Sequence, residues 1–370
     1  MVARKSRNGV RLCIFLYLAF MLYLKAPSLY YLFDWARQTN PWSGQKWIEQ
    51  VWMPTDSELQ CLNGTSRLHH QTSNSSSLSS EPPIPNLVHF NFGLKNPLYD
   101  PKTHQFDFLN YLAIRSALLS LSPDAVYLHY TYLSLPPSAD PYASPQTNPW
   151  IRRLTNQGVT LVHHPPPNFS STQRQALQYA HLSDTLRLDS LLSQGGIYLD
   201  IDAFALRPFT RLLQNPQSAI LGHEGGNRWG LCNAVIISRP NSAFLSRWLD
   251  SYSEADLSKE WNYHSVRLPK LLANSHPEEV CALAPDTFFW PTWTWRHIEW
   301  MHSPLGVQGT KEWEGIIEKN GGSLFRNQLA YHSWNQLAWE RYLSELTPEI
   351  VRTRNTRFNL LVRRFVEDDL

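Results

Sequence analysis

Strand-like and helix-like patterns alternate from residue 84 to residue 201, and few folds accommodate that order. Apolar or alternating runs predict strands at 87–92, 125–131, 159–163 and 197–201, and apolar residues at helical spacing predict helices at 108–121, 150–156 and 172–193. This alternation predicts βαβ units, a largely parallel sheet and the α/β fold class. Ligands of such open sheets bind beyond the carboxyl ends of the strands, so we expect a site near residues 200–202.

Asp200 and Asp202 flank Ile201 at the end of the last of these strands. Residues i and i+2 of an extended chain point to the same side, so both carboxylates are expected to face one point. Two like charges placed this way favour a divalent cation between them, and oxygen ligands suit Mg²⁺ or Mn²⁺. The alternative for so short a motif is a solvated turn.

The helix before this strand carries Asp184 and Arg187 in an apolar stripe with Leu177, Leu188 and Leu191. The simplest alternative is an exposed i, i+3 salt bridge, which stabilises a helix only slightly. Charges in an apolar stripe need good partners, so the position favours a larger role.

Composition excludes several classes of protein. The chain has 370 residues, of which 42% are hydrophobic, so it is not a wholly disordered chain. A formal charge of +2 gives no support to a nucleic-acid-binding function. Four cysteines are too few for a disulfide-built mini-scaffold. Cys232 with Cys281 is one candidate disulfide, and buried free thiols are the alternative.

The N-terminus predicts a membrane-attached protein. Basic residues in a cytosolic tail (1–11) precede an apolar segment (12–33) that we expect to be a transmembrane signal anchor. The alternative is a cleaved signal peptide with 12–24 as its apolar region. The positive-inside rule places the rest in the lumen, as in a single-pass type II protein of the Golgi membrane.

Three luminal segments are expected after the anchor: a Ser-rich stem (34–83), a catalytic domain (84–345) and a C-terminal extension (346–370). Luminal exposure predicts N-glycosylation at the sequons of Asn63, Asn74 and Asn168.

The run from Ser183-Asp184 and Arg187 through Gly195-Gly196-Ile197-Tyr198-Leu199-Asp200 to Asp202 resembles the signature of glycosyltransferase family 32. This family of sugar transferases with a DXD motif includes fungal mannosyltransferases and α-1,4-galactosyltransferases. Looser matches are residues 84–89, 233–236, 239–240 and 331–335, although Phe92 stands where the family usually has tryptophan.

The resemblance implies a GT-A fold, a Rossmann-like α/β/α sandwich, and a retaining transfer of a hexose from a nucleotide sugar to a glycan or glycolipid. It implies catalytic roles for Asp184, Arg187, Asp200 and Asp202, with a metal, Mn²⁺ or Mg²⁺, on Asp200, Asp202 and His332. The donor contacts implied are those of His89, Asp184, Arg187, Gly195, Gly196, Tyr198, Asn233 and Trp334.

Acceptor contacts are predicted for Glu224 and for Trp290 and Trp293, whose rings suit the C–H faces of sugars; the alternative for the tryptophans is a place in the core. Two other functions are compatible with part of the pattern. A haloacid dehalogenase-like phosphatase also places Asp-x-Asp after a strand, but Phe204 departs from its pattern. A non-catalytic glycan-binding protein on an inactive transferase scaffold is the other.

Overall fold

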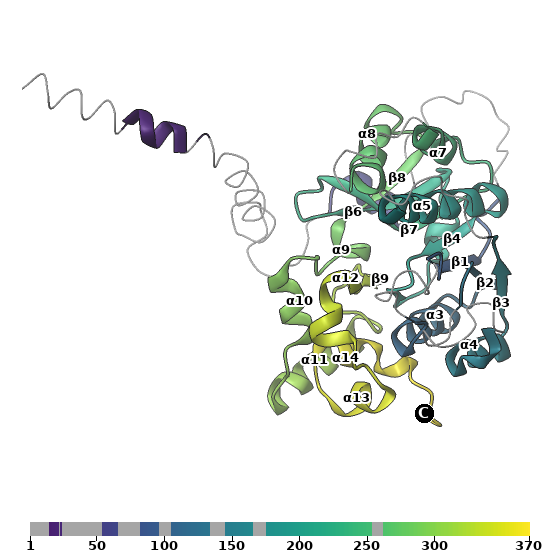
Figure 1. Cartoon of the computed structure of the whole chain (residues 1–370), viewed down its shortest axis with the longest axis vertical. Helices are drawn as coiled ribbons and strands as arrows, with labels where there is room; N and C mark the ends of the chain where they lie inside the picture. The colour runs from purple at the N-terminus through teal and green to yellow at the C-terminus, as the bar shows by residue number, and fades with distance from the viewer. Residues whose placement is uncertain are drawn as a thin grey trace, which may run out of the picture. The chain divides into compact units, whose positions relative to one another are not determined.

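The computed structural model describes residues 15–21, 23, 54–65, 82–95, 105–133, 145–165, 175–253 and 262–370 (Figure 1). The chain divides into two units, residues 1–50 and 51–370. In the first unit, residues 15–21 and 23 are helical. No helix of the described ranges combines the length and the apolar character needed to cross a membrane. Most of the predicted anchor, 12–33, lies outside those ranges, so it stays a prediction.

The second unit contains a seven-stranded sheet and a two-stranded sheet. The strands are β1 (Leu87–Phe92), β2 (Ala125–Tyr130), β3 (Val159–His163), β4 (Gly196–Leu199), β5 (Ala203–Ala205), β6 (Ala219–Glu224), β7 (Gly230–Ser238), β8 (Val280–Leu283) and β9 (Ala330–His332).

Helices connect and cover these strands. The α-helices are α2 (Asp56–Leu62), α3 (Phe108–Leu121), α4 (Pro149–Asn156), α5 (Gln175–Gln194), α6 (Thr210–Leu213), α7 (Ala243–Ser253), α8 (Leu268–Ser275), α9 (Pro285–Phe288), α10 (Trp295–His302), α11 (Val307–Lys319), α12 (Asn335–Ala338), α13 (Pro348–Thr353) and α14 (Arg357–Val362). Short 3₁₀ or π segments are η3 (Pro145–Thr147), η5 (Tyr263–Arg267), η6 (Trp339–Leu343) and η7 (Arg363–Phe365).

The large sheet has the strand order β3-β2-β1-β4-β7-β6-β8. β1, β2, β3 and β4 run parallel to one another, and β6 runs parallel to β8, whereas β7 lies between these two groups and runs antiparallel to both β4 and β6. The mixed α/β class and the mostly parallel sheet predicted from the sequence are therefore confirmed. The strand order reverses between β1 and β4, and ligands of such sheets bind beyond the strand ends at this kind of switch point.

Both faces of the sheet are buried against helices (Figure 1). Alternate residues of each strand point to opposite faces, so Ile197 and Leu199 join the core on the side of α3 and α4, whereas Tyr198 packs with α5 and α7. The strands are apolar because neither face is solvated. Asp107 begins α3 with a capping box, in which its carboxylate accepts from the backbone N–H of Asn110.

Helix α2 lies within the segment predicted as a stem, and it is part of the folded unit. Cys61 of α2 forms a disulfide with Cys281 of β8, and Cys232 is a buried free thiol. The suggested Cys232–Cys281 pair is therefore wrong. The cause of the error is the separation of 220 residues between Cys61 and Cys281, because no local pattern indicates that residue 61 packs against the sheet.

The segment predicted as a C-terminal extension also contributes to the core. Phe358, Leu361 and Val362 of α14 are fully buried in the cluster that contains β5 and β9. Glu367 accepts hydrogen bonds from Tyr111 and Arg153, which ties the end of the chain to α3 and α4. The predicted domain boundaries at 84 and 345 stay predictions, but ordered packing continues beyond both.

We expect the Cys61–Cys281 disulfide to contribute measurably to the free energy of unfolding. A cross-link over so long a loop restricts the unfolded chain, and its removal typically costs about 2–5 kcal/mol. We expect the Cys61→Ser variant to lose about that much free energy of unfolding in urea titrations. Reductant should lower the stability of the wild type and leave the variant unchanged. Equal midpoints for oxidised and reduced wild type would contradict the linkage.

Glu58 predicts a loss of stability in acid. Burial by itself raises the pKa of Glu58, but hydrogen bonds from His223 and Arg228 outweigh it and lower the pKa from 4.5 to about 2. The ionised group therefore stabilises the fold above pH 4.5, and this share is lost as the pH falls from 4.5 to about 2. We expect Glu58→Gln to lose about 3 kcal/mol at neutral pH. The gap between variant and wild type should close across that window in urea titrations, and a gap independent of pH would refute the assignment.

Candidate functional site

The candidate site lies at the carboxyl end of β4. Asp200 follows β4 directly, and the backbone then turns, with the N–H of Ala203 bonded to the carbonyl of Asp200 at 2.8 Å. Asp202 immediately precedes β5, which pairs antiparallel with β9 so that Ala203 stands opposite His332. This pairing brings a residue 130 positions away in the chain beside the two acids.

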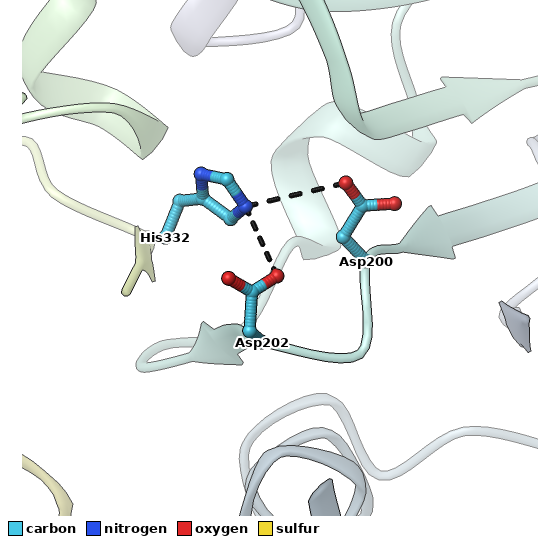
Figure 2. A group of neighbouring side chains, drawn as sticks. All are labelled: Asp200, Asp202 and His332. Atoms are coloured by element: carbon cyan, nitrogen blue, oxygen red, sulfur yellow. Dashed lines mark hydrogen bonds and ion pairs between the residues drawn. The ribbon is translucent and has the colours of Figure 1, made fainter. Parts of the chain in front are cut away.

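The side chains of Asp200, Asp202 and His332 converge (Figure 2). One ligand atom from each lies within 4.8 Å of the others. Nε2 of His332 is 3.0 Å from Oδ1 of Asp202 and 4.0 Å from Oδ2 of Asp200. The expectation that the two carboxylates face one point is confirmed, and His332 joins them.

Asp202 is held in its ionised form. Burial would raise its pKa, but the charge and hydrogen bond of His332 and the backbone N–H of Asn335, 2.8 Å from Oδ2, lower it. Burial would lower the pKa of His332, but Asp202 and Asp200 raise it. An anionic carboxylate pair beside an imidazole is a donor set that fits Mn²⁺ or Mg²⁺, provided that His332 gives up its Nε2 proton.

Arg187 connects the helix α5 to the carboxylates. Its Nη1 donates to Oδ1 of Asp200 at 2.9 Å and to the carbonyl of Asn233 at 2.8 Å. Its Nε and Nη2 donate to the carbonyl and hydroxyl of Ser183, and Nη2 lies 3.3 Å from Oδ1 of Asp184. All three guanidinium nitrogens of Arg187 are therefore engaged by protein atoms. The guanidinium is held in one position, and its hydrogen bond to Oδ1 fixes the orientation of the Asp200 carboxylate.

Asp184 is buried within the same network. Its Oδ1 accepts from Nδ2 of Asn233 at 2.7 Å, and its Oδ2 accepts from the hydroxyl of Tyr252 at 3.1 Å. Burial raises the pKa of Asp184, and Arg187, Tyr252 and Asn233 offset only part of that effect. The expected place of Asp184 and Arg187 in the apolar interior is confirmed, with exposed fractions of 7% and 6%.

Tyr198 and Trp334 border the acids. The hydroxyl of Tyr198 donates to Oδ1 of Asp200 at 2.8 Å, and Arg187 lies over its ring at 4.5 Å. Trp334 packs edge-to-face on His332 at 4.3 Å, and its indole N–H donates to the carbonyl of Pro291. Two predicted donor contacts therefore lie in the site, where Tyr198 orients Asp200 and Trp334 packs on His332.

Three predicted donor contacts lie elsewhere. Gly195 and Gly196 stand at the other end of β4, about 13 Å along the strand from Asp200. A Cβ on Gly196, at φ +107°, would meet the carbonyl of Leu87 at 2.4 Å, so close strand packing explains this glycine. His89 is fully buried, with Nε2 on the carbonyl of Gly195 and Nδ1 on His129. The structure does not bring these residues to the carboxylates.

Of the predicted acceptor residues, two lie near the metal-site residues and one lies in the core. Glu224 is 5% exposed, hydrogen-bonds with Cys232 and Trp293, and interacts electrostatically with His332. Trp293 is half-buried beside it. Trp290 is fully buried, as the alternative of a core residue has it. Asn63 is exposed, and the sequons of Asn74 and Asn168 fall outside the described residues.

Sequence reasoning missed two parts of the site. Tyr252 of α7 lies outside the motif, and nothing in its neighbourhood signals a bond to Asp184. Asn335 belongs to a matched segment, but its contribution is a backbone N–H, which no side-chain pattern reveals.

Substitution of Arg187 is expected to lower the free energy of unfolding substantially. Replacing one partner of a buried ion pair leaves the others uncompensated and typically costs 3–5 kcal/mol. We expect about that loss of unfolding free energy for Arg187→Gln, and at most about 1 kcal/mol for the control Arg247→Gln, whose pair with Glu279 is more exposed. Equal losses in urea titrations would contradict the burial argument.

Residues 56–219 match the family model described as the glycosyltransferase sugar-binding region containing a DXD motif. Glucan organizing enzyme 1 of Cryptococcus neoformans var. grubii is 38% identical over 292 residues, which are 76% of this chain and 71% of that protein. Subversion of eukaryotic traffic protein A of Legionella pneumophila is 28% identical over 89 residues, 24% of this chain and 14% of that protein.

Solved structures give weaker likenesses. The PaToxG glycosyltransferase has a TM-score of 0.37 at 15% identity and covers 76% of this chain and 88% of its own. The apo-form glycosyltransferase GlyE of Streptococcus pneumoniae TIGR4 has a TM-score of 0.42 at 12% identity and covers 76% of this chain and 60% of its own. Scores at this level carry no argument about function.

Proposed function

The chain belongs to the glycosyltransferases whose sugar-binding region contains a DXD motif, and we propose that it transfers a hexose from a nucleotide sugar to a glycan in a metal-dependent, retaining reaction. The observation that supports this most directly is the convergence of Asp200, Asp202 and His332 at the carboxyl end of β4. The alternative function of a haloacid dehalogenase-like phosphatase is wrong, because the chain belongs to a glycosyltransferase family.

Asp200, Asp202 and His332 would hold Mn²⁺ or Mg²⁺. When bound, such an ion acts as a Lewis acid that neutralises charge on a departing nucleoside diphosphate. Arg187 fixes the orientation of Asp200 from the protein side, and the backbone N–H of Asn335 does the same for Asp202. We therefore assign Arg187 a positioning role, because its nitrogens are engaged by protein groups.

Asp184 is proposed to accept hydrogen bonds from hydroxyl groups of the donor sugar. Oδ1 of Asp184 already faces Nδ2 of Asn233 and Nη2 of Arg187, but Oδ2 accepts a hydrogen bond from Tyr252 and has a second lone pair for another donor. Glu224 is proposed to bind hydroxyl groups of the acceptor, because its carboxylate lies near His332 and the metal-site residues. Product of α configuration from an α-linked donor is the expected outcome.

The acceptor is proposed to be a glycan, with glucan as the first polysaccharide to test. The 38% identical relative carries the word glucan in its name. A glycolipid acceptor is the alternative substrate class. The proposed location is the Golgi lumen, for which the Cys61–Cys281 disulfide is indirect support, since disulfides persist in oxidising compartments.

Asp202→Asn tests the metal-site proposal. We expect at least a 10²–10³-fold loss of transfer per folded molecule, roughly the size of effect seen when a charge-stabilising group is removed, and we expect the variant still to fold. Donor consumption would be followed with Mn²⁺ and a panel of GDP-mannose, UDP-galactose and UDP-GlcNAc. The control is Asp189→Asn, an exposed aspartate of α5. Full activity of Asp202→Asn, or of the wild type in excess EDTA, would count against the proposal.

A thermal-shift screen would identify the donor. A ligand that binds the folded state raises stability by about 2.7 kcal/mol at a concentration of 100 times its Kd. We expect one nucleotide sugar of the panel to raise Tm only when Mn²⁺ is present. Binding with no turnover of any acceptor, glucan included, would favour the non-catalytic alternative.

A further inference from the structure

A partly buried cluster of titratable side chains joins helix α2 to the hairpin between β6 and β7. Its four members, the Glu58 cluster, are Glu58, His223, Arg228 and Lys270. Glu58 accepts two hydrogen bonds from Arg228, Nε to Oε1 at 2.5 Å and Nη2 to Oε2 at 3.0 Å. His223 lies 3.4 Å from Oε1 of Glu58, and Nζ of Lys270 is 2.9 Å from Nε2 of His223. Glu58 itself is only 3% exposed.

The cluster connects elements that are far apart in the chain. Glu58 belongs to α2, which the Cys61–Cys281 disulfide attaches to β8. His223 belongs to β6, and Arg228 to the turn at residues 225–229. Arg228 has φ +58°, a left-handed conformation that is uncommon for a residue other than glycine, so surrounding contacts must hold it.

The same hairpin carries Glu224 to the candidate site. Glu224 follows His223 directly and pairs in register with Gly230. Its carboxylate hydrogen-bonds with Cys232 of β7 and with Trp293, and its charge acts on His332. A displacement of the turn would therefore move a carboxylate that neighbours the metal-site residues.

A purely stabilising role explains the cluster poorly. Removing Glu58 alone is costly because its partners lose their counter-charge, but well-packed apolar side chains in place of the whole cluster would often stabilise the fold as much. The bidentate geometry of Arg228 on Glu58 instead fixes direction as well as distance.

We propose that Glu58 is a positioning residue, which clamps the β6–β7 hairpin through Arg228 and His223 and so holds Glu224 where an acceptor hydroxyl binds. This inference rests on the proposed function. On this proposal, helix α2, which precedes the strands of the sheet in the chain, contributes to the geometry of the acceptor site.

The test compares Glu58→Gln, Arg228→Gln and the double variant with the control Glu279→Gln, which removes an ion pair to Arg247 next to β8. We expect the first three variants to lose about 10–100-fold in kcat for transfer, because a small misplacement of a binding group has effects of that size. The double variant should match the single ones. The Kd for Mn²⁺ alone and donor hydrolysis without acceptor should stay within about twofold of wild type, and Glu58→Asp should recover part of the loss.

Transfer by Glu58→Gln at the wild-type rate would overturn the proposal, and so would losses of Mn²⁺ binding that parallel the loss of transfer. The rate of backbone amide hydrogen exchange at residues 222–232 provides a second measurement, which needs no substrate. The rates are compared for the folded molecules of each variant only. We expect faster exchange in Glu58→Gln than in Glu279→Gln, and equal exchange would refute the clamp. If the wild type turns over no nucleotide sugar, the proposed function fails, whereas the exchange result still decides whether Glu58 holds the hairpin.

Discussion

The contact between Arg187 and Asp200 is the interaction on which the rest of the site depends. It joins α5 to the end of β4 at 2.9 Å, and the same guanidinium contacts Asp184 and the carbonyl of Asn233 on β7. Asp184 and Arg187 are thereby buried together beside the half-buried Asp200, which is tolerable only because each buried charge has a charged partner and hydrogen bonds. The arrangement leaves the outer oxygen of Asp200 facing Asp202 and His332.

The two-stranded sheet adds His332 to the site that begins at the end of β4 in the large sheet. β5 is only three residues long, yet its pairing with β9 places His332 beside both acids and aligns the N–H of Asn335 with Asp202. Trp334, in a left-handed conformation with φ 55°, turns the chain at this point and packs on His332. The chain after the sheet thus closes the site, and α14 holds β5 and β9 from behind.

Local pattern predicted the parts of the structure that local physics determines. The strands at 87–92 and 159–163 and the helix at 108–121 have the predicted bounds. Short apolar runs mark the strands, and apolar residues at helical spacing mark the helix, which begins at the capping box of Asp107. The pair Asp184 and Arg187 was recognised because its spacing places both charges on an apolar stripe. Long-range pairings were not readable in this way. The Cys61–Cys281 disulfide, the bond from Tyr252 to Asp184 and the burial of His89 depend on how distant segments pack, and one sequence carries no record of those contacts.

The most direct test of the account is the location of a bound cation. Crystals grown with Mn²⁺ and a nucleoside diphosphate would be measured at the manganese absorption edge, where anomalous scattering identifies the ion. The account predicts one strong peak enclosed by the carboxylates of Asp200 and Asp202 and the imidazole of His332. A peak coordinated by other residues, or bound nucleotide with no manganese between these side chains, would contradict it.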